Sequence, residues 1–412
     1  MVEKKMNRKN EIKKCRSCLS GEIIDILSLG DQYLSDFSNE EYKLDKSPLN
    51  LVLCRNCNLL QLKNTVSQAL LYTERYGYKS GINSTMRDEL QKIVIATQKK
   101  INNHEEVIAI DIGANDGTLL SYYPKSFFKI AIEPIKKFAN ECKRYADVVV
   151  NDYFNFKSYR SELKKKKADI ITAISCFYDI DNPNNFVRDV KKILKHDGIF
   201  VIQQNYLVGM LMNNAFDNIV HEHLAYYSLL SLEDLLSRNG LDVFHVEESA
   251  INGGSFITYI SHKGIKPIQE SVFRWKKFEK TLKLDHTKIY NDFAKRVNNN
   301  KKDLYNLISK LTDKKKSVYA YGASTRGNTL LQFYKLDNKL IKAAVERNPE
   351  KWGKNISSLK IPIISEEQAR KQKPDYMLVL PWFFKDEFIR REKDYLTNGG
   401  HFIFPLPKVE II

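Results

Sequence analysis

The chain has 412 residues, with 66 lysines and arginines against 50 aspartates and glutamates, so its formal net charge is +16. Hydrophobic residues make up 43% of it, an ordinary share for a globular protein, and this length predicts two or three domains. No apolar stretch is long enough to span a membrane and no secretory signal precedes the charged start, so we expect a cytoplasmic protein that does not bind membranes.

The positive charge raises nucleic-acid binding as an alternative. The lysines are scattered over helical faces and loops, however, and no recognition motif accompanies them. A solvated, lysine-rich surface is the preferred interpretation, and such a surface also attracts anionic small molecules.

Four cysteines near the start of the chain form two C-x-x-C pairs, which are Cys15, Cys18, Cys54 and Cys57. Four thiolates complete the tetrahedral shell of a structural zinc ion and leave no open position for catalysis. A disulfide and a redox motif are the alternatives; a cytoplasmic setting disfavours the first and the duplication disfavours the second. We expect a zinc-binding domain over residues 1–70, with a hairpin formed by residues 49–53 and 59–62.

A segment rich in tyrosine follows at residues 72–81, ahead of a helix predicted over residues 84–100. Three tyrosines, an arginine and two glycines suit a loop that caps a pocket. Packing of aromatic residues between domains is the alternative. Tyr76 and Tyr78 are the candidates to line such a pocket.

Residues 107–117 are an apolar run that ends in an acid and opens into a glycine loop. A doubly wound sheet presents a cofactor site in this way at the end of its first strand. Acidic side chains would repel a pyrophosphate, and the G-x-x-x-G spacing is not that of dinucleotide sites, so a cationic cofactor with an amino acid and a ribose fits better. S-adenosylmethionine is that cofactor, and an ordinary strand–turn–helix is the alternative. The candidate binding residues in this loop are Asp111, Gly113, Asn115, Asp116 and Gly117.

Further predicted strands alternate with helical stretches, as a parallel α/β sheet requires; they are residues 128–132, 148–150, 168–174 and 198–202. Glu133 lies about 20 residues after the glycine loop, where an acid commonly receives ribose hydroxyls. Asp152 follows the third strand, within reach of an adenine. Ser175 and Tyr178 lie at the carboxyl end of the fourth strand, the active-site side of such a sheet.

The best candidate for chemistry is the sequence His221-Glu222-His223, which lies beyond Asn205 and Tyr206. Histidine titrates near neutral pH and can take a proton at the working pH, and a neighbouring carboxylate can orient it. Histidines with a purely structural role are the alternative. A metal site made by this cluster alone is disfavoured because no third ligand is evident.

The last third is predicted to begin with charged helices over residues 269–311 and to continue as a second α/β pattern, with strands near 342–346, 375–380 and 401–404. Residues 318–327 form a second strand, glycine turn and helix start, now with hydroxyls and an arginine, which suit a phosphate. Residues 252–255 could add backbone donors or act as a hinge. The candidate substrate residues are Asn205, Tyr206, Asn252, Gly253, Gly254, Ser255, Tyr321, Gly322, Ser324, Thr325, Arg326 and Asn328.

Taken together, these motifs resemble the C-methyltransferases that act on nucleotide-linked 4-keto deoxysugars. The similarity runs from Cys15 over nearly the whole chain, and its most specific parts are the cysteines, residues 221–223, 252–255 and 321–328. The resemblance implies an α/β protein with two Rossmann-like doubly wound domains plus a small N-terminal zinc-binding domain. The implied domains are residues 1–70, residues 71–250 for S-adenosylmethionine, and residues 251–412 for the nucleotide sugar.

The resemblance also implies a mechanism. A base removes the C3 hydrogen that the 4-keto group acidifies, and the enolate carbon attacks the methyl group of the sulfonium. The family's base falls on His223, supported by Glu222, while Tyr76, Tyr78 or Tyr178 would donate to the enolate oxygen. Departures from the family pattern at Val220, Ile257 and residues 178–179 keep methylation of a sugar hydroxyl open as an alternative.

The remaining expectations concern class and assembly. A zinc-ribbon protein that binds nucleic acid is the alternative from another functional class. A monomer is expected for three packed domains.

Overall fold

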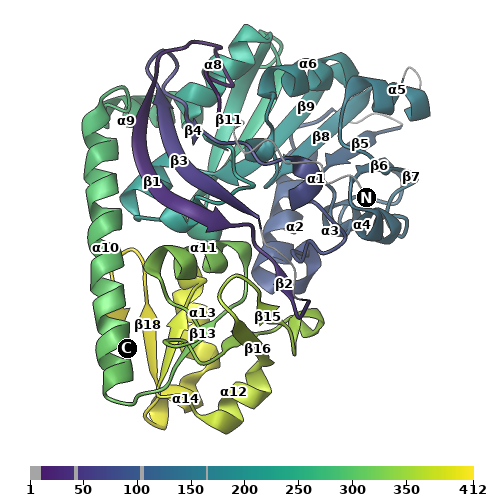
Figure 1. Ribbon diagram of the computed structural model, residues 1–412. Coiled ribbons are helices and arrows are strands. Elements are labelled where there is room, and N and C mark those ends of the chain that lie inside the picture. Colours follow the sequence, from purple (N-terminus) through teal and green to yellow (C-terminus); the bar gives the residue numbers. More distant parts are fainter. Residues whose placement is uncertain (1–10, 41–44, 103–105, 164–165) are drawn as a thin grey trace, which may run out of the picture.

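A computed structural model describes residues 11–40, 45–102, 106–163 and 166–412. The described residues contain three sheets, and Figure 1 shows the N-terminal strands beside the central domain and reaching down to the C-terminal domain. The predicted α/β class with a small N-terminal module is confirmed.

The N-terminal sheet has the order β1-β3-β4-β10, where β1 is Ile23–Tyr33, β3 is Lys46–Cys54, β4 is Leu60–Leu62 and β10 is Ala225–Tyr226. The predicted hairpin is confirmed in β3 and β4, which pair antiparallel. Neighbouring domains share strands with this module: β10 comes from the central domain, while β2 (Phe37–Ser38) pairs with β15 (Asn355–Ile356) of the C-terminal sheet. The module is therefore joined through backbone hydrogen bonds to both of its neighbours.

The central sheet has seven strands in the order β11-β12-β9-β8-β5-β6-β7. Their bounds are β5 Ile108–Ile112, β6 Phe128–Ile132, β7 Val148–Val150, β8 Ala168–Ile174, β9 Leu194–Asn205, β11 Leu241–Ser249 and β12 Ser255–His262. The four strands predicted after the glycine loop are confirmed, and the strands from β5 to β9 are parallel. β12 enters antiparallel beside β9, so this sheet extends past the domain boundary predicted at residue 250.

Helices of the central region flank this sheet; they are α1 Gln68–Leu71, α2 Ser84–Gln98, α3 Thr118–Ser121, α4 Lys136–Cys142, α5 Phe156–Leu163, α6 Pro183–Ile193, α7 Leu207–Met212 and α8 Leu229–Arg238. In α6, the Asn182 side chain accepts from the backbone N–H of Asn185, and Pro183 stands in the first turn. The buried residues of α6 include Phe186 and Val190, four positions apart, so one face packs on the sheet.

The C-terminal sheet has the order β19-β18-β17-β13-β14-β16-β15-β2. Its own strands are β13 Val318–Tyr321, β14 Ala344–Glu346, β15 Asn355–Ile356, β16 Ile361–Ser365, β17 Tyr376–Val379, β18 His401–Phe404 and β19 Glu410–Ile411. Its helices are α11 Thr325–Tyr334, α12 Glu366–Gln372, α13 Lys385–Arg391 and α14 Lys393–Thr397. β14, β13, β17 and β18 are parallel neighbours, so this domain is also Rossmann-like.

Two helices connect the sheets, α9 (Glu270–Thr281) and α10 (Thr287–Asp313), as the sequence predicts. The 27-residue α10 runs along one flank of the molecule and contacts β1, α7 and α11, which belong to three different parts of the chain (Figure 1). Its buried residues recur at helical spacing, for example Tyr290, Phe293 and Val297. Among the described helices, none is long and apolar enough to cross a membrane.

Candidate functional site

The four cysteines of the N-terminal module converge, with their Sγ atoms all within 4.8 Å of one another. Cys15 and Cys57 are 3.6 Å apart and Cys18 and Cys54 are 3.4 Å apart, while a tetrahedral zinc ion sets its sulfurs about 3.8 Å apart. All four thiols are free, so the disulfide alternative is absent from the structure. This donor set fits zinc.

The two halves of the zinc site share one backbone shape. In the first, the N–H of Leu19 donates to the carbonyl of Cys15, and in the second the N–H of Asn58 donates to Cys54, both at 3.0 Å. The Gln61 amide donates to the Cys15 sulfur at 3.2 Å. Donation from the Cys57 thiol lowers the pKa of Cys15, with Gln61 adding to it, and the same contact raises the pKa of Cys57, so Cys15 is the sulfur of this pair that ionises first.

The zinc module is anchored to the central domain through the residues between its first two cysteines. Arg16, 5% exposed, donates from Nε to Asp181 at 3.1 Å, and Ser17 receives two hydrogen bonds from Arg238. Neither contact is predicted from the sequence. A zinc ion bound to these cysteines would therefore fix a turn that seats the module on the central domain.

A cavity of about 590 Å³ opens at the carboxyl ends of β5, β6 and β8, a size typical of small-molecule sites. The sequence-predicted residues that line it are Asp111, Gly113, Asn115, Glu133, Ser175, Tyr76 and Tyr78. Asp116, Gly117 and Asp152, although described, are not among its lining residues. The cavity thus gathers most of the predicted cofactor residues and two of the predicted tyrosines.

The glycine loop lies against the end of β8. Gly113 has φ +73°, and a Cβ there would lie 3.1 Å from the sulfur of Cys176, so only glycine fits without displacement. Asp116 accepts hydrogen bonds from Thr118 at 2.6 Å and from the N–H of Gly81 at 2.8 Å. This acid therefore shapes the loop and holds the tyrosine segment against it.

Two carboxyl groups give the cavity its chemical character. Asp111, 3% exposed, accepts from the Thr172 hydroxyl at 2.6 Å, and Glu133 accepts from the N–H groups of Asn115 and Ile135, each at 2.8 Å. Burial raises the pKa of Asp111 and of Glu133 to about 7. A cationic ligand would stabilise the ionised form of both, which fits the sulfonium and amino groups of S-adenosylmethionine.

Positive side chains also reach the cavity, since Arg188 and Lys192 are among its lining residues. The Lys192 ammonium is paired with Asp189 at 2.8 Å, so its charge is partly balanced. Both cations are on α6. The groups beside the glycine loop are the buried acids Asp111 and Glu133.

The tyrosine segment is fastened across the glycine loop. The Asn115 side chain accepts from the N–H of Ser80 at 2.9 Å and donates to the carbonyl of Tyr78 at 3.2 Å. Lys137 donates to the carbonyl of Tyr76 at 2.6 Å. The segment thus caps the cavity, as its composition predicts.

The His223 ring is held in one tautomer. Its Nδ1 lies 2.8 Å from the carbonyl of Asn218, and because a carbonyl only accepts, Nδ1 carries the proton and Nε2 keeps its lone pair. Burial, and then the charge of Arg326, lowers the pKa of His223 to about 3, so the imidazole is neutral at physiological pH. Its ring meets that of Tyr178 edge-on, with centroids 4.4 Å apart.

Buried carboxyl groups lie near these rings. Burial raises the pKa of Glu222 to about 7, and one of its oxygens has no hydrogen-bond partner among the described residues. Asp179 accepts from the Tyr72 hydroxyl at 2.8 Å, and its other oxygen is equally unpartnered. Burial, then Glu222 and Asp179, raises the pKa of Tyr76 well above its ordinary value. Tyr72 and Asp179 were not predicted as site residues. The position of Asp179 after β8, on the active-site side of the sheet, is the sequence feature that could have identified it.

His221 has a different environment from His223. Its Nε2 donates to the carbonyl of Ser47 on β3 at 2.9 Å, and the residue is 4% exposed. Burial lowers the pKa of His221 to about 4. This histidine joins the central domain to the zinc module.

The predicted substrate residues of the central domain lie at the junction of β9 and β12. Asn205 and Ser255 are paired across the two strands, and the N–H of Tyr206 donates to the carbonyl of Gly254. The Tyr206 hydroxyl donates to buried Glu279 at 2.9 Å, and Ser255 donates to the carbonyl of Ile251. These side chains bond mainly to the protein itself, although one Asn205 oxygen is buried without a partner among the described residues.

The predicted substrate residues of the C-terminal domain lie at the carboxyl end of β13 and the start of α11. Ser324 accepts from the N–H of Gly327 and caps α11, Thr325 begins that helix, and Gly322 packs against Pro381. Asn328 accepts from Ser358 and donates to Ser35, whereas Arg326 is bound to Asp217 of the central domain.

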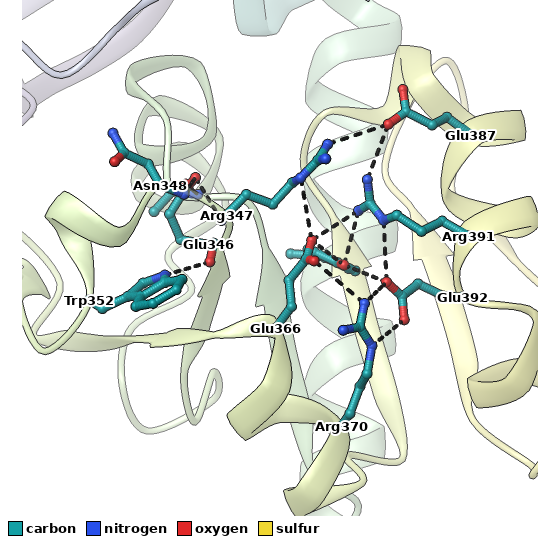
Figure 2. A network of polar contacts seen from close by, with 11 residues as sticks. Glu346, Arg347, Asn348, Trp352, Glu366, Arg370, Glu387, Arg391 and Glu392 are labelled. Carbon is teal, nitrogen blue, oxygen red and sulfur yellow. Dashed lines mark hydrogen bonds and ion pairs between the residues drawn. The ribbon is translucent and has the colours of Figure 1, made fainter. Parts of the chain in front are cut away.

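Tyr321 belongs to a network of charged side chains at the same edge of the sheet. Its hydroxyl donates to Glu366 or Glu392, at 2.7 and 2.8 Å, and accepts from Arg391 at 3.0 Å. Figure 2 shows Arg370 and Arg391 bound to both of these glutamates. The Tyr321 hydroxyl is thus committed within its own domain.

Three family models match successive parts of the chain: a zinc binding domain at residues 15–72, a methyltransferase domain at residues 79–246 and a C-methyltransferase C-terminal domain at residues 250–407. A curated relative, C-methyltransferase NovU of Streptomyces niveus, is 27% identical over 408 residues, which are 97% of either chain. The chain belongs to the S-adenosylmethionine-dependent C-methyltransferases. The enzyme uses S-adenosylmethionine, and its cysteine cluster is a zinc site.

Solved methyltransferase structures are similar to part of this chain. One is an S-adenosylmethionine-dependent methyltransferase from Clostridium acetobutylicum ATCC 824, with 13% identity, 43% of this chain and 92% of that chain covered, and a TM-score of 0.34. Another is the N-methyltransferase NodS from Bradyrhizobium japonicum WM9, with 11% identity, 44% and 98% covered, and a TM-score of 0.34. The family models and NovU carry the assignment.

Proposed function

We propose that this enzyme methylates a carbon, C3, of a nucleotide-linked 4-keto-6-deoxy sugar. The observation that carries the proposal is the orientation of His223: its Nδ1 proton is held by the carbonyl of Asn218, so Nε2 keeps the lone pair that can take a proton. Carbon methylation needs such a base because a C–H group must lose its proton before the carbon can act as a nucleophile.

In the proposed mechanism, Nε2 of His223 takes the C3 proton that the adjacent 4-keto group acidifies. The electron pair passes to the keto oxygen, and a hydroxyl from Tyr76, Tyr78 or Tyr178 donates to that developing oxyanion. When bound, S-adenosylmethionine supplies an electrophilic methyl group. The enolate carbon would take this methyl group as its bond to sulfur breaks, with S-adenosylhomocysteine as the leaving group, and His223 would release its proton to solvent.

The other site residues have supporting roles in this proposal. Burial keeps Glu222 protonated for part of the time near neutral pH, so it is able to donate a hydrogen bond to the sugar. Asp111 and Glu133 face the positive end of the cofactor. We assign no proton transfer to His221, because its Nε2 donates to Ser47.

We place the nucleotide of the acceptor beside the start of α11. The backbone N–H groups of Ser324 and Thr325, and those of Asn252 and Gly253 in the neighbouring turn, would supply donors there for a diphosphate. In this arrangement residues 1–70 hold a structural zinc ion, while residues 71–250 bind the methyl donor and residues 251–412 bind the methyl acceptor.

The experiment is incubation of the zinc-loaded enzyme with methyl-labelled S-adenosylmethionine and 4-keto-6-deoxyglucose linked to uridine or thymidine diphosphate. Mass spectrometry and NMR of the product then locate the label. A methyl group on C3 is expected. Label on a sugar oxygen would replace the proposal by O-methylation, and transfer to neither sugar would refute it.

A further inference from the structure

Asp217 is a buried carboxylate that receives three hydrogen bonds from the C-terminal domain. Arg326 on α11 donates to its Oδ2 from Nε at 2.9 Å and also from Nη2, and Trp382 donates from its indole nitrogen at 3.2 Å. The Asp217 side chain is 1% exposed and that of Arg326 is 16% exposed. This is a desolvated ion pair between two domains.

Arg326 is also bound on its other side. Nη1 and Nη2 each donate to the carbonyl of Asn252 at 3.2 Å, and the guanidinium lies 4.7 Å from the ring centre of Phe383. Protein atoms thus receive four hydrogen bonds from a side chain that has five N–H groups. Little of the guanidinium is left for a phosphate, which is the role that the sequence alone predicts for it.

Asp217 lies one residue before the group that orients the base. The short helix η3 (Phe216–Asn218) ends with Asn218, whose carbonyl accepts the Nδ1 proton of His223 at 2.8 Å. The side chain of Asn218 donates to the carbonyl of Ala215, within the same turn. A carboxylate fixed at residue 217 therefore fixes the direction of the next carbonyl, and with it the tautomer and orientation of His223.

The C-terminal side of this contact is equally restrained. Trp382 packs against Gly253, where a Cβ would lie only 2.9 Å from the indole ring. The neighbouring carbonyl of Asn252 is the one that binds Arg326. Arg326 and Trp382 therefore each contact both η3 and the turn at residues 252–254.

We propose that Asp217 and Arg326 are positioning residues for His223: their ion pair couples the seating of the C-terminal domain to the geometry of the base. This inference rests on the proposed function, since it takes His223 as the base. It follows that the base is correctly oriented only while the acceptor-binding domain is docked.

Two variants test the coupling. Asp217→Asn removes the charge that holds Arg326, and Arg326→Lys keeps the charge but loses the paired donors. The matched control is Asp292→Asn, which alters an exposed ion pair with Lys288 on α10. Methyl transfer to the diphosphate-linked 4-keto sugars gives kcat, and titration of the acceptor into enzyme with bound S-adenosylhomocysteine gives its Kd.

The expected result is a fall in kcat of about a hundredfold for both variants, because a small displacement of a base is costly, with the acceptor Kd within about twofold of wild type. Nitrogen-15 NMR of the zinc-loaded enzyme should show a protonated Nδ1 at His223 in wild type and in Asp292→Asn, and mixed tautomers in both test variants. Should Asp217→Asn not fold, Arg326→Lys gives the same measurements.

Two outcomes would overturn the inference. A weaker acceptor Kd with unchanged kcat would make Arg326 a substrate ligand, and unchanged kcat, Kd and NMR signal would leave the ion pair without a role in the reaction. Failure of the proposed function is a separate result, because it would appear in wild type as methyl transfer to oxygen or to neither sugar.

Discussion

Replacing His223 by asparagine should remove the base while keeping its surroundings. The introduced side-chain amide retains an N–H group of the kind that His223 directs to the carbonyl of Asn218, but it has nothing that corresponds to the basic Nε2. Loss of a general base slows a reaction by about 100- to 10,000-fold, which corresponds to about 3–5 kcal/mol of transition-state stabilisation. We therefore expect His223→Asn to lower kcat by this factor.

The affinity for S-adenosylmethionine should remain within about twofold of wild type, because His223 is not among the residues that line the cofactor cavity. Single-turnover transfer from labelled S-adenosylmethionine measures the chemical step, and calorimetry measures cofactor binding. The matched control is His286→Asn, an exposed histidine beside α10, which should behave as wild type. A kcat for His223→Asn close to that of wild type would refute the assignment of the base.

Three further predictions concern the cofactors. Metal analysis should find a single zinc ion per chain. Removal of this ion by a chelator, or the substitution Cys54→Ser, should lower the thermal midpoint of unfolding, because the cysteine turn seats the first module on the central domain. An unchanged midpoint would contradict this role. Gly113→Ala should destabilise the protein by about 1–2 kcal/mol because of its left-handed backbone, and it should weaken S-adenosylmethionine binding. Adding Cys176→Ala should relieve the clash of the new Cβ with the sulfur but not the backbone strain. Denaturant unfolding measures the stability, and calorimetry measures the cofactor affinity. Burial raises the folded pKa of Asp111 and Glu133 to about 7, above their unfolded values, so the ligand-free folded protein binds more protons than the unfolded chain and its stability should fall as pH rises through this range. Binding of the cationic cofactor should release these protons, and the affinity should increase between about pH 6 and pH 7.5. Calorimetry in buffers of different ionisation enthalpy measures the release, and its absence would show that these acids do not face the cofactor.

Much of the fold is predictable because its strands are local signals. The runs that form β6, β8 and β18 are apolar and bounded by turn residues, and each predicted range is confirmed. The place of β12 in the central sheet cannot be predicted from local sequence. Asn252 and two glycines precede it and indicate a hinge, whereas antiparallel pairing with β9, about fifty residues earlier, draws this strand into the central sheet.

The candidate site shows the same division between local and distant contacts. The cysteine pairs and the glycine loop carry their spacing in the sequence, so the zinc ligands and the cavity lining are predictable. The environment of His223 depends on a carbonyl five residues away, and that of Asp217 on Arg326, which is 109 residues distant. From the sequence alone, an arginine after a glycine turn indicates a phosphate site. In the folded protein Arg326 is instead bound to the buried carboxylate of Asp217.

The central claim is that His223 takes a proton from carbon, and deuterium exchange tests it most directly. Enzyme saturated with S-adenosylhomocysteine, which has no methyl group to give, is incubated in heavy water with the diphosphate-linked 4-keto-6-deoxyglucose. Proton NMR should show loss of the C3 hydrogen signal with wild type and with His286→Asn, and retention of that signal with His223→Asn. Exchange that is absent in wild type, or equally fast without His223, would contradict the account.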